Sequence, residues 1–248
     1  RIARKHLHNP QEISIKAKTA TAETIRPRYW MVSGFHKLDA LTRILEVEEF
    51  DGMIVFVRTK LATVEVADKL AAHGFAAEAL NGDMNQAMRE RTVERLKQGK
   101  LDIVVATDVA ARGLDVQRIS HVVNFDIPND PESYVHRIGR TGRAGRKGKA
   151  ILFVQPRENR LLKSIERSIR QAIPAMALPT AGDLSEHRID RFVAVLRDTM
   201  AEQDLDYYYR LVSRMTQEQE MSELDIAAAL TYLGQKDRPF DAAGGQEQ

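Results

Sequence analysis

The amino-acid sequence predicts an α/β protein, in which helices cover both faces of a parallel sheet and a small all-helical domain follows. Two observations carry this prediction. Up to residue 154, short apolar runs alternate with segments whose apolar residues recur at helical spacing. Such alternation is typical of a parallel sheet with crossover helices. After residue 157 the strand pattern stops and helical periodicity continues alone.

The predicted strands are short and mostly apolar. Tyr29 and Trp30 suit a half-buried position on the first strand. The wholly apolar run Met53–Val57 is typical of a buried parallel strand. The strands are expected at residues 25–32, 53–57, 76–80, 102–106, 120–125 and 150–154.

Helical segments lie between several of these strands. Leu38, Leu41 and Leu45 repeat at helical spacing, and glycines at positions 74 and 99 are plausible helix ends. The helices are expected at residues 36–48, 61–72 and 86–98.

The last part of the chain has only helical patterns. Pro174 and Pro179 end the first of these helices, and Asp183 or Ser185 is expected to cap the next. The helices are expected at residues 157–173, from 183 or 185 to 200, at 204–217 and at 222–233.

These patterns divide the chain into four predicted parts. Residues 1–24 are polar and basic, and we interpret them as a linker from an upstream domain. The chain, which does not begin with Met, is therefore expected to be an inner piece of a longer protein. Residues 25–156 form the sheet domain and residues 157–240 the helical domain. The Gly/Gln-rich residues 241–248 are expected to be disordered.

Composition excludes some classes of site. The chain has no cysteine, so it has neither a disulfide nor a cysteine zinc site, and a cytoplasmic location is expected. No apolar run is long enough to span a membrane.

The net charge of +2 is unevenly placed, with eleven Lys/Arg against two Glu in residues 137–170. Residues 183–248 carry seven Lys/Arg against fourteen Asp/Glu. A basic middle indicates contact with a polyanion, although such runs are also common on solvated faces.

Residues 136–145 carry the clearest chemical signal. Arg137, Arg140 and Arg143 are three residues apart, which would place them on one face of a helix, and glycines lie between and after them. Arginine presents a charged, planar fork of donors that fits phosphate oxygens. Glycine allows a bulky anion to approach the backbone. The alternative is a solvated arginine face that ends in a glycine C-cap.

The stretch HRIGRTGR at residues 136–143 resembles motif VI of superfamily 2 helicases, in the form seen in DEAD-box RNA helicases. The stretch ATDVAARGLD at residues 106–115 resembles their motif V, in the family's order. The resemblance implies that the sheet domain is the second RecA-like domain of such a helicase. The helical tail is similar to the dimerisation region of the family's bacterial cold-shock branch.

The resemblance assigns roles in ATP hydrolysis. Arg140 and Arg143 are implied to be arginine fingers that reach the γ-phosphate. The resemblance places His136 and Arg137 nearer the network between the two helicase domains. Asp115, with Gly113 beside it, is implied to accept hydrogen bonds from the nucleotide ribose. The alternative for Asp115 is a cap or turn residue.

The sequence has no G-x-x-x-x-G-K-[ST] phosphate loop and no Asp-Glu-Ala-Asp string for magnesium. In the family these belong to the first domain. ATP and Mg²⁺ are therefore expected as cofactors bound mainly by an upstream domain, and this chain alone is expected to be inactive.

RNA-backbone contacts are expected where loops follow strands or open helices, because ligands collect beyond the carboxyl ends of parallel strands. Thr59 alone favours neither a structural nor a binding role. By resemblance to motifs IV, IVa and V, the residues are Arg58, Thr59, Gly82, Asp83, Gln86, Arg89, Thr107 and Arg112. Such binding is expected to be independent of sequence and sensitive to salt.

The apolar stripes of the tail must be buried, either against each other or against a second copy of the chain. The resemblance favours a homodimer. The stripe residues expected at its interface are Leu205, Tyr208, Leu211, Val212, Met215, Leu224, Ala227 and Leu230.

The leading hypothesis is therefore the C-terminal half of an ATP-dependent RNA helicase that separates short duplexes. The second is a non-enzymatic scaffold that binds RNA and dimerises. The third, an unrelated nucleotide-binding domain, is disfavoured by the two motifs. Cold adaptation, ribosome assembly and RNA decay, with partners in such assemblies, are implied by the resemblance alone.

Overall fold

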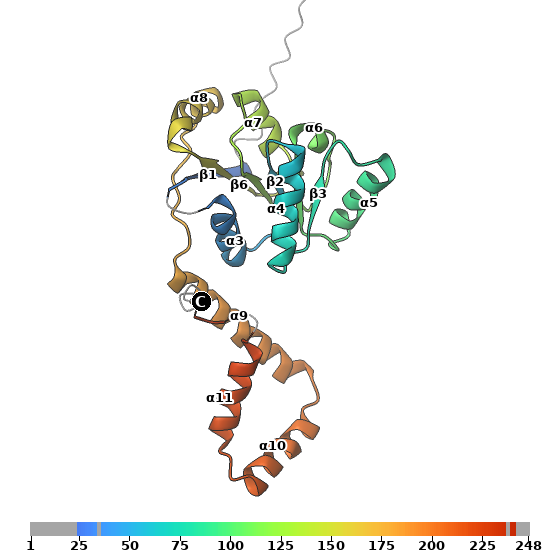
Figure 1. Ribbon diagram of the computed structural model, residues 1–248, viewed down its shortest axis with the longest axis vertical. Coiled ribbons are helices and arrows are strands. Elements are labelled where there is room, and N and C mark those ends of the chain that lie inside the picture. The colour runs from blue at the N-terminus through green and yellow to red at the C-terminus, as the bar shows by residue number, and fades with distance from the viewer. Residues whose placement is uncertain (1–23, 34–35, 237–238, 242–248) are drawn as a thin grey trace, which may run out of the picture. The chain divides into compact units, whose positions relative to one another are not determined.

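The computed structural model describes residues 24–33, 36–236 and 239–241. Within these ranges the chain forms two compact units (Figure 1). The sheet unit takes in residues up to 33 and residues 50–176, and the helical unit takes in residues from 34 to 49 and from 177 onward. The expectations for a linker at 1–24 and a disordered tail at 241–248 concern residues that lie almost wholly outside the described ranges.

The sheet unit contains six parallel strands in the order β1-β6-β5-β2-β4-β3. The parallel sheet predicted from the sequence is thus confirmed. The strands are β1 (Ile25–Met31), β2 (Met53–Phe56), β3 (Ala77–Leu80), β4 (Ile103–Ala106), β5 (His121–Asn124) and β6 (Gly148–Val154).

The strand order decides which face each crossover helix covers, because such crossovers are right-handed. The chain moves toward one edge from β2 to β3 and then back from β3 to β4, β5 and β6. The helix between β2 and β3 therefore lies on one face, and the helices between β3 and β6 lie on the other. The first is α4 (Lys60–Ala72), and the others are α5 (Gln86–Lys97), α6 (Asp108–Ala111) and α7 (Pro131–Ile138). Helix α8 (Asn159–Ile169) follows β6.

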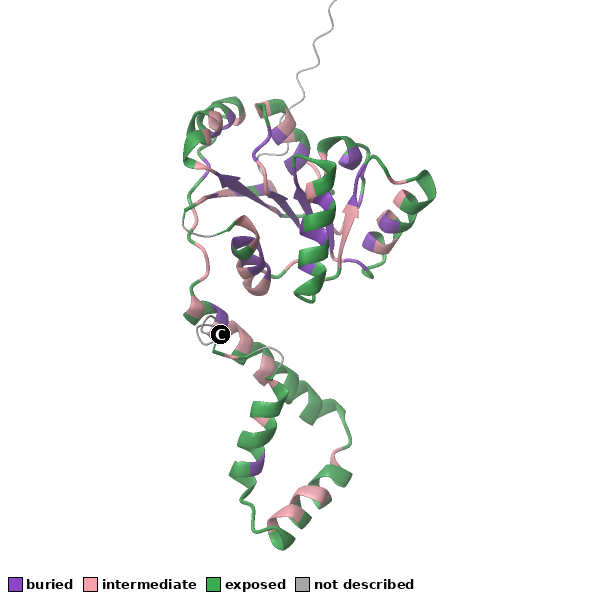
Figure 2. Ribbon diagram, viewed as in Figure 1, coloured by how far each residue is buried: buried purple, intermediate pink, exposed green. Residues whose placement is uncertain are grey.

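The register of the strands agrees with this arrangement. Ile54 of β2 is level with Val104 of β4 and Val122 of β5, so the three side chains point to the same face. They pack with Leu96 of α5 and Ala110 of α6 in one buried cluster. Figure 2 shows this burial concentrated along the central strands. The runs without polar residues are buried on both faces, as expected for a parallel sheet.

Helix α8 belongs to the sheet unit, although the sequence pattern placed it in the helical domain. Its Leu162 and Ile165 are buried with Tyr134 of α7 and Leu152 of β6. Its apolar stripe is thus covered by the sheet unit itself. The compact unit extends to Met176, whose backbone N–H donates to the Tyr29 carbonyl of β1.

The helical unit contains α3 (Lys37–Val47), α9 (Ala181–Glu202), α10 (Asp206–Glu218) and α11 (Glu223–Gly234). Arg188 of α9 donates to Glu46 of α3 through Nε and Nη2, at 3.0 and 2.8 Å. Within the described ranges, no helix is at once long and apolar enough to cross a lipid bilayer.

The start of α9 differs from the sequence prediction. Thr180 is the N-cap, and its hydroxyl accepts from the Asp183 N–H while the Asp183 carboxylate accepts from the Thr180 N–H. The expectation that Asp183 or Ser185 caps this helix is therefore wrong. Asp183 is the third residue of a capping box, a position that also favours an acidic side chain.

The segment after α8 is held by Glu166, which generates a prediction about pH. Glu166 accepts from the Ile173 N–H at 2.9 Å and from Lys163 Nζ at 3.2 Å. The Ile173 N–H, with help from Lys163, lowers the pKa of Glu166 below its ordinary value of 4.5. A lowered folded-state pKa stabilises the fold above the unfolded-state pKa, and this stabilisation is lost as the pH falls through the folded-state value.

We therefore expect Glu166→Gln to lower the free energy of unfolding by about 1 kcal/mol at pH 7, because a charged acceptor is replaced by a neutral one. The difference from the wild type should shrink as the pH falls through the lowered folded-state pKa of Glu166. Urea unfolding at pH 7, 5 and 3 measures this. Glu94→Gln, on an exposed helix face, is the control. A difference that stays constant with pH would contradict the assignment.

Candidate functional site

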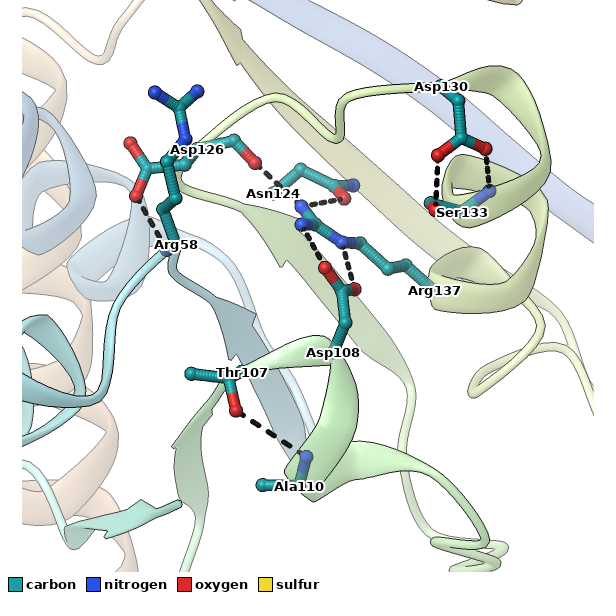
Figure 3. A network of polar contacts seen from close by, with 9 residues as sticks. All are labelled: Arg58, Thr107, Asp108, Ala110, Asn124, Asp126, Asp130, Ser133 and Arg137. Atoms are coloured by element: carbon teal, nitrogen blue, oxygen red, sulfur yellow. Dashed lines mark hydrogen bonds and ion pairs between the residues drawn. The ribbon is translucent and has the colours of Figure 1, made fainter. Parts of the chain in front are cut away.

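The carboxyl ends of the parallel strands meet at one edge of the sheet, where ligands of such folds bind. Arg58 follows β2, Thr107 follows β4 and Asp126 follows β5 at this edge (Figure 3). Several of the following helices begin here with a side-chain cap: Thr59 for α4, Asn85 for α5, Thr107 for α6 and Asp130 for α7.

Arg137 of α7 is the centre of the polar network at this edge. Its Nε and Nη2 donate to the two carboxylate oxygens of Asp108 at 2.6 and 2.8 Å. Its Nη1 donates to the Asp126 carbonyl at 2.6 Å and to Asn124 Oδ1 at 3.2 Å (Figure 3). Only 4% of Arg137 is exposed. A buried guanidinium requires such partners, since an unpaired buried charge is costly.

The network extends to the loop after β2. The Arg137 guanidinium lies 5.1 Å from the centre of the Phe56 ring, within the range of a cation–π contact. The Arg58 N–H donates to Asp126 Oδ2 at 2.9 Å. Arg137 thereby joins the end of β2, the start of α6 and the end of β5.

The Arg137 guanidinium therefore donates to acceptors within the sheet unit, whereas the side chain of its neighbour His136 is exposed. Their role in coupling two helicase domains stays a prediction. The sequence pattern did not indicate Asp108, Asn124 and Asp126 as site residues. For Asp108 a signal was available, because it directly follows Thr107 at the end of a predicted strand.

The other two arginines of this stretch lie beyond the helix. Helix α7 ends at Ile138 with Gly139 as its C-cap, so the three arginines do not share a helix face as expected. Arg140 Nη1 donates to the Leu114 carbonyl at 2.9 Å. Arg143 Nε donates to the Gly139 carbonyl at 2.9 Å.

Arg143 also pairs with Asp115. The structure thus brings together Arg140, Arg143 and Asp115, the three side chains predicted to meet the nucleotide. Asp115 is 75% exposed and Arg143 is 29% exposed. Burial lowers the pKa of Arg140, as does the nearby Arg143 charge, while Asp115 opposes the shift. Arginine has such a high intrinsic pKa that it stays charged.

Gly113 and Gly142 have structural roles that the sequence pattern did not indicate. A Cβ at Gly142 would lie 2.7 Å from Cγ1 of Ile25, and its φ of +67° favours glycine. The close neighbour at Gly142 is therefore strand β1, which explains this glycine without an anion. Gly113 has a φ of +77° with open space around it, so its conformation alone explains the glycine.

The residues predicted to contact RNA lie along the same edge, several with structural partners. The hydroxyls of Thr59 and Thr107 accept from the backbone N–H groups of Ala62 and Ala110, at 3.1 and 3.4 Å. Asp83, beside Gly82, pairs with Lys60.

Two predicted residues on α5 differ in their partners. Gln86 donates to Glu90 at 2.7 Å on the helix surface. Arg89 Nη2 donates to the Arg112 carbonyl at 3.1 Å and so ties α5 to the loop after α6. The side chains of Arg58 and Arg112 are exposed.

A shallow cavity opens at this edge of the sheet. Because three arginines and a histidine line it, anions are the ligands that it favours. It is lined by Phe56, Asp108, Ala111, Arg112, Ser133, His136, Arg137 and Arg140. Among the described residues, His, Asp and Glu side chains form no cluster of three that could hold a metal ion.

Comparison with known proteins places this geometry in a family. The helicase conserved C-terminal domain matches residues 36–145, and the RNA helicase DeaD dimerization domain matches residues 179–244. The chain covers 91% of a chain of the Escherichia coli DEAD-box protein SrmB, solved bound to regulator of ribonuclease activity A. The match covers 62% of this chain, with 40% identity and a TM-score of 0.58. The chain belongs to the DEAD-box RNA helicase family.

Longer relatives of this DEAD-box chain show how much of a family member it spans. It is 54% identical to the ATP-dependent RNA helicases DeaD of Mycobacterium tuberculosis and E. coli. The matches cover 93% and 96% of this chain but 40% and 38% of those proteins. Saccharomyces cerevisiae Dbp5 L327V, bound to RNA and ADP BeF3, matches 71% of this chain and 47% of its own. The identity is 31% and the TM-score 0.63.

The predicted fold and family are thereby confirmed, including the RecA-like nature of the sheet unit. The roles of the individual site residues stay predictions.

The Arg137 network makes a testable demand on stability. We expect Asp108→Ala to lower the free energy of unfolding by about 2 kcal/mol, since the buried Arg137 guanidinium loses two of its four hydrogen bonds. Asp51→Ala, which breaks an exposed ion pair with Arg146, should cost no more than about 1 kcal/mol. Urea unfolding of both variants measures the difference. Equal costs would show that Arg137 does not depend on Asp108.

Proposed function

We propose that this chain is the C-terminal half of an ATP-dependent DEAD-box RNA helicase that unwinds or remodels short RNA duplexes. The chain supplies arginine fingers and contacts to the RNA backbone, and its helical unit supplies a dimer interface. In support, the relatives at 54% identity are named ATP-dependent RNA helicases. A solved relative carries RNA and a nucleotide analogue.

One observation carries the nucleotide part of the proposal. Arg140, Arg143 and Asp115 lie close together and bind each other or the backbone. In the proposed mechanism, nucleotide phosphate replaces Asp115 as the partner of Arg143, and Asp115 is freed to accept from the ribose hydroxyls. Arg140, anchored on the Leu114 carbonyl, would keep a second positive charge beside the phosphate.

ATP would supply the bond that is broken, and residues outside this chain would hold the adenine and the magnesium, since this sequence has no phosphate loop. This chain would neutralise charge on the transferred group. It would do so only when the two helicase domains close, which makes the site composite. His136 is exposed and would serve that closure.

The RNA part of the proposal rests on exposed cations beside the starts of helices. Arg58 and Arg112 are exposed, and the N-termini of α4 and α5 offer backbone N–H groups toward phosphates. Phosphate contacts position an RNA without reading its sequence. We therefore propose binding that is independent of sequence and weakened by salt.

The dimer part rests on apolar side chains that the described chain leaves uncovered. Tyr208 is 59% exposed, Leu224 78% and Leu230 59%, while Ile226 is buried. Leu205, Leu211, Val212 and Met215 are half-buried and Ala227 is exposed. A second copy of the chain would cover this surface. A cytoplasmic location, and work in cold adaptation, ribosome assembly or RNA decay, belong to the same proposal.

The assignment of Arg143 as an arginine finger predicts a loss of ATP hydrolysis without a loss of RNA affinity. In the full-length protein, Arg143→Ala should lower the rate of ATP hydrolysis by about 10³-fold, the usual cost of a missing arginine finger. Affinity for single-stranded RNA should change less than about twofold, since Arg143 is not among the proposed RNA contacts. Arg146→Ala is the control, because this arginine pairs with Asp51 and the Gln117 carbonyl and is not a proposed finger. Equal losses of RNA affinity and turnover would refute the assignment.

The proposed dimer surface leads to a prediction about the molecular mass in solution, which a substitution on that surface should halve. Wild-type chain should scatter light as a dimer, and Leu224→Glu should make it a monomer, because a carboxylate would be buried against apolar side chains. Leu61→Glu places the same charge at another exposed leucine, in the sheet unit, and should leave the dimer intact. A wild-type monomer would contradict the proposed interface.

A further inference from the structure

A groove runs along the free edge of the sheet, apart from the site described above. Strand β3 is the last strand in the sheet order, so its outer edge has no neighbouring strand among the described residues. The groove has a volume of about 500 Å³ and a mostly apolar lining. An unpaired strand edge beside an apolar groove is a template for pairing with another chain.

Helices from opposite faces of the sheet form the walls of the groove. Val64 of α4 lines one wall, and Met84 and Met88, before and within α5, line the other. Val64 is 42% exposed and Met88 is 53% exposed. Ala79 of β3 lies between them. Flexible methionine side chains suit a surface that accepts more than one apolar side chain.

The backbone of β3 is available at this edge. The Ala76 carbonyl accepts from the N–H groups of Asp102 and Ile103, so it faces β4. Peptide groups of alternate residues point to opposite edges of a strand. Ala77 and Ala79 therefore turn their N–H and C=O groups away from β4. Their small side chains leave that edge uncovered, and both residues are partly exposed.

The charges of the groove favour an acidic partner. Glu78 is already paired with Arg95 and accepts from the Thr92 hydroxyl at 3.1 Å. Arg91 lies three residues after Met88 on the same side of α5 and is exposed. Within the described chain it has no ion pair, so it is the surplus charge of the groove.

We propose that this groove binds an extended segment of a partner protein, which adds a strand to β3. The segment would place alternate apolar side chains against Val64 and Met88 and an acidic side chain beside Arg91. Peptide recognition by strand addition combines backbone hydrogen bonds with pockets for alternate side chains. RNA fits less well, because the walls are apolar and the floor carries Glu78. Arg89, a proposed RNA contact, points from α5 toward the Arg112 loop instead.

The test is a selection of peptides on the intact 248-residue chain. A displayed library of random twelve-residue peptides is selected on the wild type, with Met88→Glu as the counter-target. We expect selected peptides to carry an acidic residue beside alternating apolar residues. Their synthetic copies should bind Met88→Glu and Arg91→Glu at least tenfold more weakly. Lys97→Glu makes the same charge change elsewhere on α5 and should bind normally.

The strand-addition geometry has its own readout. Hydrogen exchange at Ala77 and Ala79 should slow when the peptide is bound. Ala79→Pro should abolish binding, because it removes an outward N–H and none that pairs with β4. Circular dichroism confirms that each variant is folded. If Ala79→Pro does not fold, the exchange measurement on the wild type decides.

Three outcomes would overturn the proposal. The first is a selection that enriches nothing above the Met88→Glu counter-target. The second is peptide binding without slower exchange at the two alanines. The third is a ten-nucleotide oligoadenylate RNA whose affinity falls with both Met88→Glu and Arg91→Glu, which would assign the groove to RNA.

Discussion

The bidentate contact between Arg137 and Asp108 is the constraint on which the functional edge depends. Arg137 is 4% exposed, so its charge is tolerated only while Asp108, Asn124 and Asp126 supply acceptors. Asp108 comes from the start of α6, and Asn124 and Asp126 come from the end of β5 and the residues after it. The guanidinium therefore fixes these segments relative to one another. Asp126 in turn fixes the backbone of Arg58 by accepting from its N–H. A single buried cation thus positions the surface that surrounds it.

Arg143 differs from Arg137 because its carboxylate partner can be exchanged. Arg143 binds an exposed carboxylate, Asp115, and such pairs contribute little stability in water. An anionic ligand can displace Asp115 at small cost, and the guanidinium is already held by the Gly139 carbonyl. Preorganised donors of this kind need little rearrangement when charge develops. The stretch from 136 to 143 therefore combines one buried structural arginine with two half-buried arginines that we propose bind the nucleotide.

The sequence pattern was sufficient for the sheet but not for the partners of its surface residues. Strands such as Met53–Phe56 are wholly apolar, and only burial on both faces explains that composition. The stripe of α8 was equally clear, yet periodicity shows only that a face is buried and not what buries it. Leu162 and Ile165 in fact pack within the sheet unit. Motif spacing likewise located Arg137 but could not show that its charge is turned inward.

Helix α5 carries residues of both the proposed RNA surface and the proposed peptide groove. Arg89 reaches the carbonyl of Arg112 on one side, while Met88 and Arg91 border the free edge of β3 on the other. Residues three or four apart share a helix face, and adjacent residues do not. A partner segment bound at the free edge of β3 would therefore leave Arg89 and the Arg112 loop accessible. Because Gly82 and Asp83 lie just before the Asn85 N-cap of α5, any rigid shift of α5 caused by a bound strand would also move the Gly82–Asp83 turn. Partner binding and RNA binding would then be coupled through a single helix.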